Sequence, residues 1–436
     1  MGKGRARTTD PMLATPPMNP AQQARLRECR DCGQFQLVPP LPPAASAHCL
    51  RCDAVLRHTC RDPLWTQLAL NVTALLLLLI AVPSVLMLVS TAGQVHVADM
   101  FTGPVGLDEH GMWELAAVVL FTTIAAPALK IACMLYVLIG LRLRDPPRHI
   151  RMVFAWVQHV RPWSMIEVYL LGVFVAYVRL QSIVFIEIGV ALYALGALLL
   201  TMIAADVQLD AQFVWEEMER RGIPNRHVDH AAVAATAQRD RVIGCDTCGL
   251  VQVAAARTRC PRCGFRLFQR KPNSVMRTWA LGIAAAILYV PANIYPVLTV
   301  VQLGAGQPST ILGGARELLE LGEWPLAALV FFASIMVPLL KLIGLTVLLI
   351  SIQTRRRDRL RDRTVLYRII DYIGRWSMID IFMESILVAL VQFGAIVTIN
   401  PGFGAIAFAA VVILTMFAAR TFDPRLMWDV AQARTA

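Results

Sequence analysis

Four pairs of cysteines with the spacing C-x-x-C carry the strongest chemical signal in this chain. They fall into two clusters: Cys29, Cys32, Cys49 and Cys52 in "CRDCGQ" and "CLRC", and Cys245, Cys248, Cys260 and Cys263 in "CDTCGL" and "CPRCGF". Two such pairs about ten to twenty residues apart are typical of a closed tetrahedral zinc site, because each pair presents two thiolates from one tight turn. Since protein fills all four ligand positions, the sequence predicts two structural zinc ions.

Iron remains an alternative, because mononuclear iron sites use similar cysteine turns. Zinc is preferred because the sequence shows no site for a redox partner. His48, His58 and Cys60 lie near the first cluster, but surplus donors beside a complete set of ligands are expected to be bystanders. The paired spacing in a chain with cytoplasmic segments favours metal over disulfide bonds.

Ionisable residues inside long apolar segments form the second group of interest. Lys130 and Lys341 lie near the middle of such segments, where an ionised side chain costs at least about a few kcal/mol. Glu167 and Asp380 lie just inside the apolar segments that follow. We therefore expect ion pairs between Lys130 and Glu167 and between Lys341 and Asp380.

Three further polar residues accompany these acids, namely Ser164, Ser377 and Glu384. Asp380 and Glu384 are four residues apart and share a helix face with Ser377, so the second set is the more acidic one. Two interpretations stay open. Either the charges only hold helices together, or they line a water-accessible cavity that accepts a lipid head group or a proton.

The elements that must position these groups are membrane spans. Hydrophobic residues make up 57% of the 436 residues and charged residues only 16%, which excludes water as the main solvent. Eight apolar segments are predicted to span the membrane, at about residues 64–90, 112–141, 163–180, 182–205, 275–299, 325–353, 376–399 and 402–421. The first follows about sixty residues of Pro-rich and Cys-rich sequence, so it is not a cleavable signal peptide.

The distribution of arginine predicts the orientation. The segment 91–112 contains no Lys or Arg, whereas 142–161 contains five Arg, and the second half repeats this asymmetry after residue 354. Both termini and both cysteine clusters are therefore expected in the cytoplasm, with the chain in an inner membrane. The segments "RHIRMVFAWVQHVRPW" and "RLRDRTVLYRIIDYIGRW" resemble interfacial helices on anionic lipid. These flanking positions explain the net charge of +11 without nucleic acid.

An internal repeat organises the chain. Pro127 and Lys130 recur 211 residues later as Pro338 and Lys341, and "WSMIE" at Trp163 recurs as "WSMID" at Trp376. The predicted fold is an all-α polytopic membrane protein with two tandem four-helix modules, each preceded by a zinc ribbon. The predicted boundaries are a disordered tail at 1–28, ribbons at 29–60 and 243–270, helical modules at 61–210 and 271–425, a linker at 211–242 and a tail at 426–436.

The motifs resemble those of the bacterial paraquat-inducible protein A family, which includes the membrane subunits of lipophilic envelope-spanning tunnel systems. The matching features are the eight cysteines, P-x-x-K in the second span and W-S-M-[IV]-[ED] at the third. The resemblance implies a Gram-negative inner-membrane protein that moves lipids toward the outer membrane with a periplasmic MCE-domain partner. The wider first cysteine spacing, with "QFQLVPPLPPAASAH" inserted, departs from the family pattern.

No enzyme motif is present: the sequence contains no Walker loop, no H-E-x-x-H and no nucleophile elbow. Two hypotheses remain. The first is a lipid-handling transporter subunit, and the second is a membrane-anchored redox or metal-sensing protein with rubredoxin-like iron sites. Buried lysines and acids at equivalent depths in both halves favour the first hypothesis.

Overall fold

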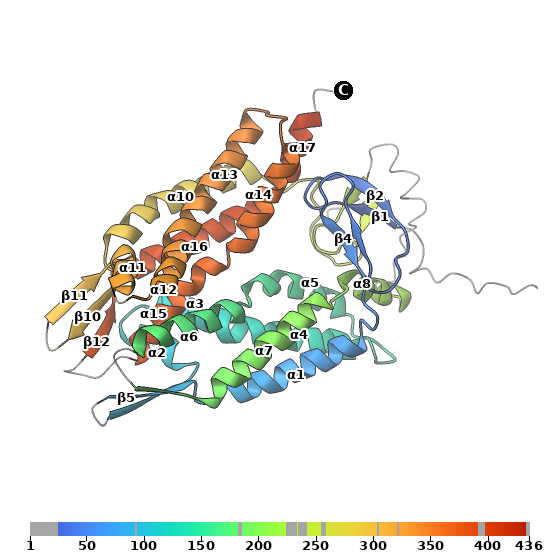
Figure 1. The fold of residues 1–436 in the computed structure, drawn as a ribbon. Coiled ribbons are helices and arrows are strands. Elements are labelled where there is room, and N and C mark those ends of the chain that lie inside the picture. Colours follow the sequence, from blue (N-terminus) through green and yellow to red (C-terminus); the bar gives the residue numbers. More distant parts are fainter. Residues whose placement is uncertain are drawn as a thin grey trace, which may run out of the picture.

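The computed structural model describes residues 25–91, 94–181, 185–223, 233, 242–253, 259–302, 305–320, 322–390 and 397–432. The described chain is mainly helical, as predicted, and carries two small cysteine-containing ribbons at one end (Figure 1). Two sets of elements with the same order follow one another along the chain. We refer to residues 65–220 as the first half and to residues 274–432 as the second half.

The first half runs helix, hairpin, short helix, long helix, interfacial helix, helix, strand, helix and terminal helix. Its elements are α1 (Trp65–Ala81), β5 (Met87–Thr91), β6 (Gln94–Ala98), α2 (Thr102–Glu109), α3 (Trp113–Leu120), α4 (Ala126–Gly140), α5 (Ile150–Val160), α6 (Ile166–Leu180), β7 (Phe185–Ile188), α7 (Val190–Val207) and α8 (Ala211–Arg220).

The second half repeats this order element by element. Its elements are α10 (Ser274–Ile294), β10 (Leu298–Gln302), β11 (Ala305–Ser309), α11 (Ile311–Glu320), α12 (Trp324–Phe331), α13 (Val337–Gln353), α14 (Leu360–Ile373), α15 (Ile379–Leu390), β12 (Val397–Pro401), α16 (Phe403–Thr421) and α17 (Arg425–Gln432). The halves therefore share an element order as well as a sequence motif.

Six helices of the described chain are long and apolar enough to cross a membrane, which is two fewer than predicted. They are Trp113–Gly140, Ile150–Leu180, Val190–Val207, Ser274–Ile294, Trp324–Gln353 and Phe403–Thr421. The two remaining predicted spans correspond to α1, with 17 residues, and α15, with 12 described residues. Residues 391–396 of the predicted span at 376–399 lie outside the described chain.

The prediction of one helix over residues 64–90 is wrong in its last part. Helix α1 ends at Ala81, and Met87–Thr91 form strand β5, which pairs with β6 and β7. Strand β10 pairs in the same way with β11 and β12. A continuous apolar run fits a buried strand as well as a helix, and Pro83 falls where the helix stops. The two sheets lie at the end of the molecule opposite the ribbons (Figure 1).

A π-helical turn interrupts the long helix of each half at the same place. The turns are Phe121–Ala125 and Phe332–Met336, and each directly precedes the helix that starts with Pro127 or Pro338 near its first residue. A proline lacks the backbone N–H and its ring clashes with the carbonyl four residues earlier, so a widened turn accommodates it. This explains why the repeated prolines stand within a continuous span.

The two halves pack closely through one helix of each, α6 and α15. Helices α6 and α15 approach at Gly172, where an added Cβ would lie 2.9 Å from Cβ of Phe382. Tyr169 and Phe382 also form an edge-to-face pair with ring centroids 5.7 Å apart. The short helix α2 packs on the same helix α15, with Gly103 facing Ser385. Helix α15 thus lies at the centre of the interface between the halves.

The cysteines of each ribbon pack against the half to which that ribbon does not lead in sequence, while Arg27 and Arg57 of the first ribbon also form ion pairs with Glu216 of α8 in the first half. The first ribbon comprises β1 (Arg25–Glu28), β2 (Phe35–Val38), β3 (Ser46–His48) and β4 (Val55–His58), and its cysteines share a buried cluster with Leu348, Phe422 and Trp428 of the second half. The second ribbon contains β8 (Val242–Gly244) and β9 (Val251–Val253). Its cysteines share a buried cluster with Phe154 and Trp215 of the first half.

Three predicted segments around the ribbons differ from the structure. The expected tail over residues 1–28 lies outside the described chain up to residue 24, but Arg25–Glu28 form strand β1 of the first ribbon. The expected tail over 426–436 instead contains most of helix α17, whose Trp428 ring contacts the guanidinium of Arg51 at 4.2 Å. Part of the linker 211–242 is helix α8. Each of these corrections adds a packing element that holds a ribbon in place.

Candidate functional site

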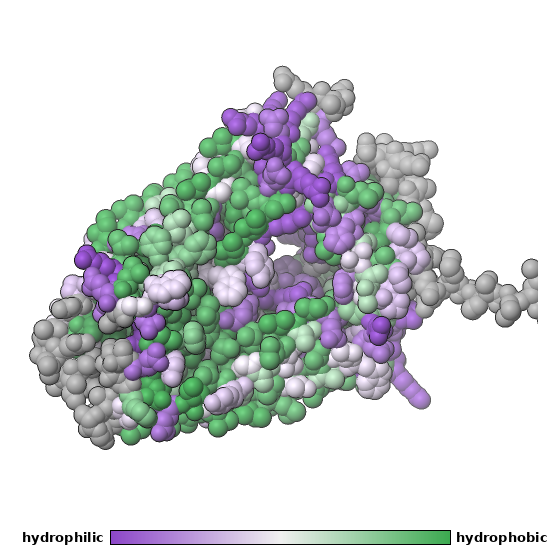
Figure 2. All heavy atoms as spheres, in the orientation of Figure 1, coloured by the Kyte–Doolittle hydropathy of each residue, from purple (hydrophilic) through white to green (hydrophobic). Residues whose placement is uncertain are grey.

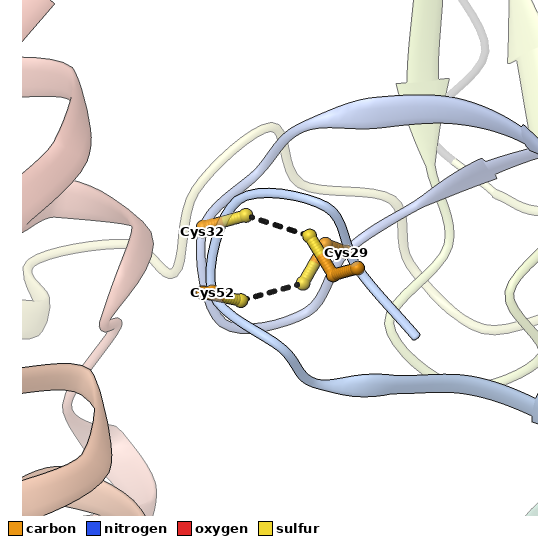
Figure 3. Close-up of side chains that lie close together, drawn as sticks. Cys29, Cys32 and Cys52 are labelled. Atoms are coloured by element: carbon orange, nitrogen blue, oxygen red, sulfur yellow. Dashed lines mark hydrogen bonds between the residues drawn. The ribbon is translucent and has the colours of Figure 1, made fainter. Parts of the chain in front are cut away.

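The eight predicted cysteine ligands form two compact groups. In the first ribbon the Sγ atoms of Cys29 and Cys52 are 3.5 Å apart and those of Cys32 and Cys49 are 3.6 Å apart. Figure 3 shows Cys29, Cys32 and Cys52 pointing toward one another from two facing turns. In the second ribbon the corresponding distances are 3.6 Å for Cys245 and Cys263 and 3.5 Å for Cys248 and Cys260. A zinc ion 2.3 Å from four sulfurs requires edges of about 3.8 Å, so both groups fit such an ion.

The four C-x-x-C turns share one backbone pattern. The N–H of the first cysteine donates to the carbonyl five residues later, and its carbonyl accepts from the N–H four residues later, at 2.8 to 2.9 Å in all four turns. The residue at this fourth position has a positive φ between 62° and 81°; it is Gly33, Gly249 and Gly264 in three turns and Asp53 in one. Glycine adopts this left-handed conformation readily, which explains the CxxCG spacing.

The two metal groups differ in their outer contacts. Gln36 donates to Sγ of Cys49 at 2.9 Å, and Arg368 of α14 donates to Sγ of Cys52 at 3.4 Å and to its carbonyl at 3.0 Å. Cationic donors of this kind offset the charge of a tetrathiolate site. In the second group, burial raises the pKa of Cys248 well above its ordinary value, so an ionised thiolate there requires a bound cation.

A cavity of about 1110 Å³ lies between the two halves, on the side of the ribbons. Figure 2 shows the hollow opening on one side of the molecule, with hydrophilic residues around it and apolar helix surfaces on both sides. Its walls combine both kinds of residue. The cations are Arg30, Lys130, Arg161, Lys271, Lys341, Arg375 and Arg420; the carboxylates are Glu167, Asp206 and Asp371; the apolar wall includes Leu170, Leu171, Leu199, Met202, Ile203 and Met416.

Lys130 lines this cavity, but its predicted ion pair is wrong. Its Nζ lies 2.9 Å from Asp206 at the end of α7, and Arg161 approaches the same carboxylate at 3.4 Å. Glu167 instead forms an ion pair at 3.5 Å with Arg375 of the second half. The packing of α4 beside the end of α7 therefore decides the partner.

Lys341 also lines the cavity, and its predicted pairing with Asp380 is wrong as well. Its Nζ donates to Oγ of Ser377 at 3.2 Å and to the carbonyl of Gly374 at 3.4 Å. Among the described residues, Lys341 forms no ion pair within 4.0 Å, although its exposed fraction is only 2%. Ser164, the counterpart of Ser377, lines the same cavity without a hydrogen-bond partner in the described chain.

Asp380 and Glu384 lie apart from the cavity. Both are buried in α15, and within the described chain neither oxygen of Asp380 nor Oε1 of Glu384 has a hydrogen-bond partner. The polar groups that face Asp380 are Ser334 and Arg179. The seven predicted polar residues thus divide into a cavity group and a buried acidic pair, with Ser377 beside Lys341.

Arg179 is a polar residue of this region that the sequence interpretation passed over. It lies near the end of α6, is largely buried, and donates to the carbonyl of Gly314 of the second half at 3.1 Å. An arginine inside an apolar segment is energetically costly in a membrane, so its position in the sequence could have identified Arg179 as a residue of interest. Its partner could not be found from sequence, because Gly314 and Asp380 both belong to the other half.

Comparison with known proteins finds relatives that are named as transport proteins. The family model "Paraquat-inducible protein A" matches residues 64–219 and again 275–432. The "Intermembrane transport protein PqiA" of Escherichia coli K12 is 31% identical over 402 residues, covering 92% of this chain and 95% of that protein. The "Lipophilic envelope-spanning tunnel protein A" of the same organism is 31% identical over 437 residues, covering 97% and 99%.

A "Probable intermembrane transport protein" of Haemophilus influenzae is 27% identical over 289 residues, covering 64% of this chain and 66% of that protein. No solved structure matches the chain. The two matches of one family model fall on the two halves described above, and the two Escherichia coli relatives span nearly the whole chain.

Proposed function

Because the chain belongs to the paraquat-inducible protein A family, we propose that it is the inner-membrane subunit of a system that moves lipids between membranes. In this proposal a lipid enters the cavity between the halves and passes to a periplasmic MCE-domain tunnel protein. The chain acts without enzymatic chemistry. Its relatives are named as transport proteins, which is consistent with this role.

The observation that carries the proposal is the two-sided wall of the cavity. A glycerophospholipid has a charged head group and two apolar chains, so its site needs cations or hydrogen-bond donors beside an apolar surface. The cavity offers Lys130 and Lys341 beside Leu199, Met202 and Met416. Its opening between apolar helix surfaces gives access from a surrounding bilayer (Figure 2).

The membrane orientation in this proposal rests on the arginine asymmetry. The arginine-rich loops mark the cytoplasmic side of the membrane. Because each tandem module follows a ribbon, both ribbons and both termini then lie in the cytoplasm. The three-stranded sheets then lie at the periplasmic end, where an MCE-domain partner would dock. Trp113 and Trp324 are both strongly exposed at equivalent positions at the start of their spans, as expected for side chains in a membrane interface.

The ribbons hold structural zinc in this proposal. With four thiolates in each site, the metal has no open position for water or substrate, so it stabilises the fold rather than reacting. The buried polar residues Asp380 and Glu384 would carry a proton that is linked to lipid movement, because two adjacent acids at membrane depth are costly unless one is protonated.

A photo-crosslinking experiment tests lipid entry. A photoreactive amino acid at Met202, on the cavity wall, should form a phospholipid adduct when the protein is irradiated after purification in detergent. The matched control is Leu200, which is 69% exposed on the outer face of the same helix α7 and should lose its lipid in detergent. Absence of a lipid adduct at Met202, with normal folding, would contradict the proposal.

A further inference from the structure

The charges around the cavity are unequally compensated, and this difference points to a class of ligand. The carboxylates Glu167 and Asp206 are each held by cations of the cavity itself, Arg375 at 3.5 Å and Lys130 at 2.9 Å. Arg161 approaches Asp206 as well, at 3.4 Å, so these five groups together carry only one net positive charge. They leave little net charge for a ligand to neutralise.

Four other cations of the cavity have no carboxylate within 4.0 Å among the described residues. Lys341 contacts only a hydroxyl and a carbonyl, and Lys271 donates to the carbonyls of Arg420 and Phe422 at 2.6 and 2.9 Å. Arg420 lies over the ring of Trp163 at 5.1 Å, and Arg30 donates to the carbonyl of Thr247 at 3.3 Å. All four residues line the same cavity.

Asp371 is the one carboxylate on the cavity wall that no cation of the described chain contacts within 4.0 Å. It faces Lys271, Lys341 and Arg420 from a greater distance. Lys271 is also faced by Asp423 and Asp246, but Asp371 is the only carboxylate found to face Lys341 and Arg420 among the described residues, so the cavity keeps an excess of positive charge. Such an excess in a partly dehydrated space favours a bound anion.

The neighbouring cavity serves as an internal comparison. A second space of about 890 Å³ lies toward the ribbons and shares Arg30, Lys271 and Asp371 with the first. Its own additional arginines are compensated: Arg368 pairs with Asp31 at 2.6 Å, and Arg425 with Glu28 at 3.2 Å and Asp246 at 3.0 Å. Of the four uncompensated cations, Lys341 and Arg420 line only the first cavity, where the apolar wall begins.

From this arrangement we propose that the cavity selects acidic glycerophospholipids over zwitterionic ones, with the lipid phosphate among Lys271, Lys341 and Arg420. The inference rests on the proposed function and deepens it by naming the substrate class. An acidic lipid brings a net negative charge, which reduces the excess. A zwitterionic lipid brings none, and its ammonium group would meet cations on most sides. The acyl chains would lie along Leu199, Met202 and Met416.

The test uses the photoreactive residue at Met202 in the full-length protein, reconstituted in vesicles of equal parts phosphatidylglycerol and phosphatidylethanolamine. Adducts are identified by mass spectrometry. We expect phosphatidylglycerol adducts to exceed phosphatidylethanolamine adducts about tenfold, as expected for one additional charge-assisted contact. The double variant Lys341→Gln/Arg420→Gln should bring this ratio close to one while adducts still form.

The control is the double variant Arg356→Gln/Arg357→Gln, which removes the same charge from an exposed loop and should keep the ratio. Equal adducts of the two lipids in the unaltered protein would overturn the headgroup selection alone, whereas no adduct of either lipid would overturn the proposed function. Added inorganic phosphate should leave the adducts unchanged. Loss of phosphatidylglycerol adducts in phosphate would show a site for a small free anion and would overturn the inference.

Discussion

The first and second halves have the same element order, yet they treat their repeated lysine differently. Lys130 of the first half forms an ion pair with Asp206. Lys341 of the second half is as deeply buried but contacts only Ser377 and Gly374. The position in α16 that corresponds to Asp206 is occupied by Ala419. A duplicated scaffold thus holds one neutralised and one unneutralised lysine on the two sides of one cavity.

The acidic residues of the two halves also differ in whether a nearby cation compensates their charge. Glu167 faces the cavity and reaches across it to Arg375, whereas its counterpart Asp380 is buried in α15 next to Glu384, whose own counterpart is Leu171. The first half therefore has the properties of a structural frame. The second half holds the charges that only a ligand, a proton or a conformational change can compensate, so we expect it to carry more of the activity.

The largest expected effect comes from removing the metal site of one ribbon. Replacing Cys245 and Cys248 with serine should remove the second metal and lower the folded yield several-fold, because metal binding contributes about 10 kcal/mol or more to the folding of such small sites. Since the second ribbon packs on Phe154 and Trp215, faster hydrogen exchange should appear in α5 and α8 of the first half.

The matched variant Cys29→Ser/Cys32→Ser should affect α14 and α17 of the second half, which contact the first ribbon, and also α8, whose Glu216 pairs with Arg27 and Arg57 of that ribbon. Elemental analysis of the unaltered protein should find two zinc ions per chain. Unchanged exchange in α5 after loss of the second ribbon, or in α14 and α17 after loss of the first, would contradict the packing of the cysteine clusters, and iron in place of zinc would favour the redox or metal-sensing hypothesis.

The next effect distinguishes the two lysines. Lys130→Met/Asp206→Leu replaces a pair of which only Lys130 is buried with apolar residues, a change that often leaves stability unaltered, so lipid transport should largely persist. Lys341→Met should fold but lose transport, because no partner is left unpaired and the lost group is a ligand contact. Transport is measured as restored envelope integrity in cells that lack the protein. Full activity of Lys341→Met would remove the functional difference between the halves.

The buried acid gives a related comparison within the second half. Asp380→Asn keeps the shape of the side chain but cannot be ionised, so it should fold normally and abolish transport if a proton is carried there. A double apolar exchange, Lys341→Met/Asp380→Leu, should fold and remain inactive. Full activity of this double variant would show that the two residues only hold helices together.

The sequence predicted the parts of this structure that depend on local spacing. The turns at the cysteines follow from CxxC, with glycine directly after the second cysteine in three of the four, and the six long spans follow from apolar length. The helices at 150–160 and 360–373 follow from alternating Arg and aliphatic residues. Each of these features is set by residues within one turn or one segment.

The features that it missed depend on residues that are distant in sequence. The partner of Lys130 lies 76 residues away, and only packing of α4 against the end of α7 brings it near. The exchange of the ribbons could not be predicted, because both halves offer similar surfaces to either ribbon. Strands β5 and β10 escaped notice because their apolar residues continue those of a helix, and periodicity does not separate the two in short runs.

A smaller effect tests the contact between helices α6 and α15. Gly172→Ala should lower stability by about 1–3 kcal/mol, because the added methyl group would lie 2.9 Å from Cβ of Phe382 in the other half. The control is Gly196→Ala in α7, where no atom lies within 4 Å of the added Cβ and where alanine should favour the helix by about 1 kcal/mol. Thermal unfolding in detergent measures both. Equal stability of the two variants would argue against close packing of α6 on α15.

The smallest expected effect concerns the ion pair that joins the halves across the cavity. Glu167 and Arg375 lie 3.5 Å apart, and about a third of each side chain is exposed, at 31% and 33%. Such a pair contributes about 0 to 1 kcal/mol, so neither Glu167→Gln nor Arg375→Gln should change thermal stability measurably. Their effects on ligand selection should differ. Arg375→Gln leaves Glu167 free to repel an anion, whereas Glu167→Gln frees Arg375 and should increase the preference for acidic lipid. Opposite shifts in the adduct ratio at Met202 would support a cavity whose charge balance sets selection, and identical shifts would assign the pair to packing alone.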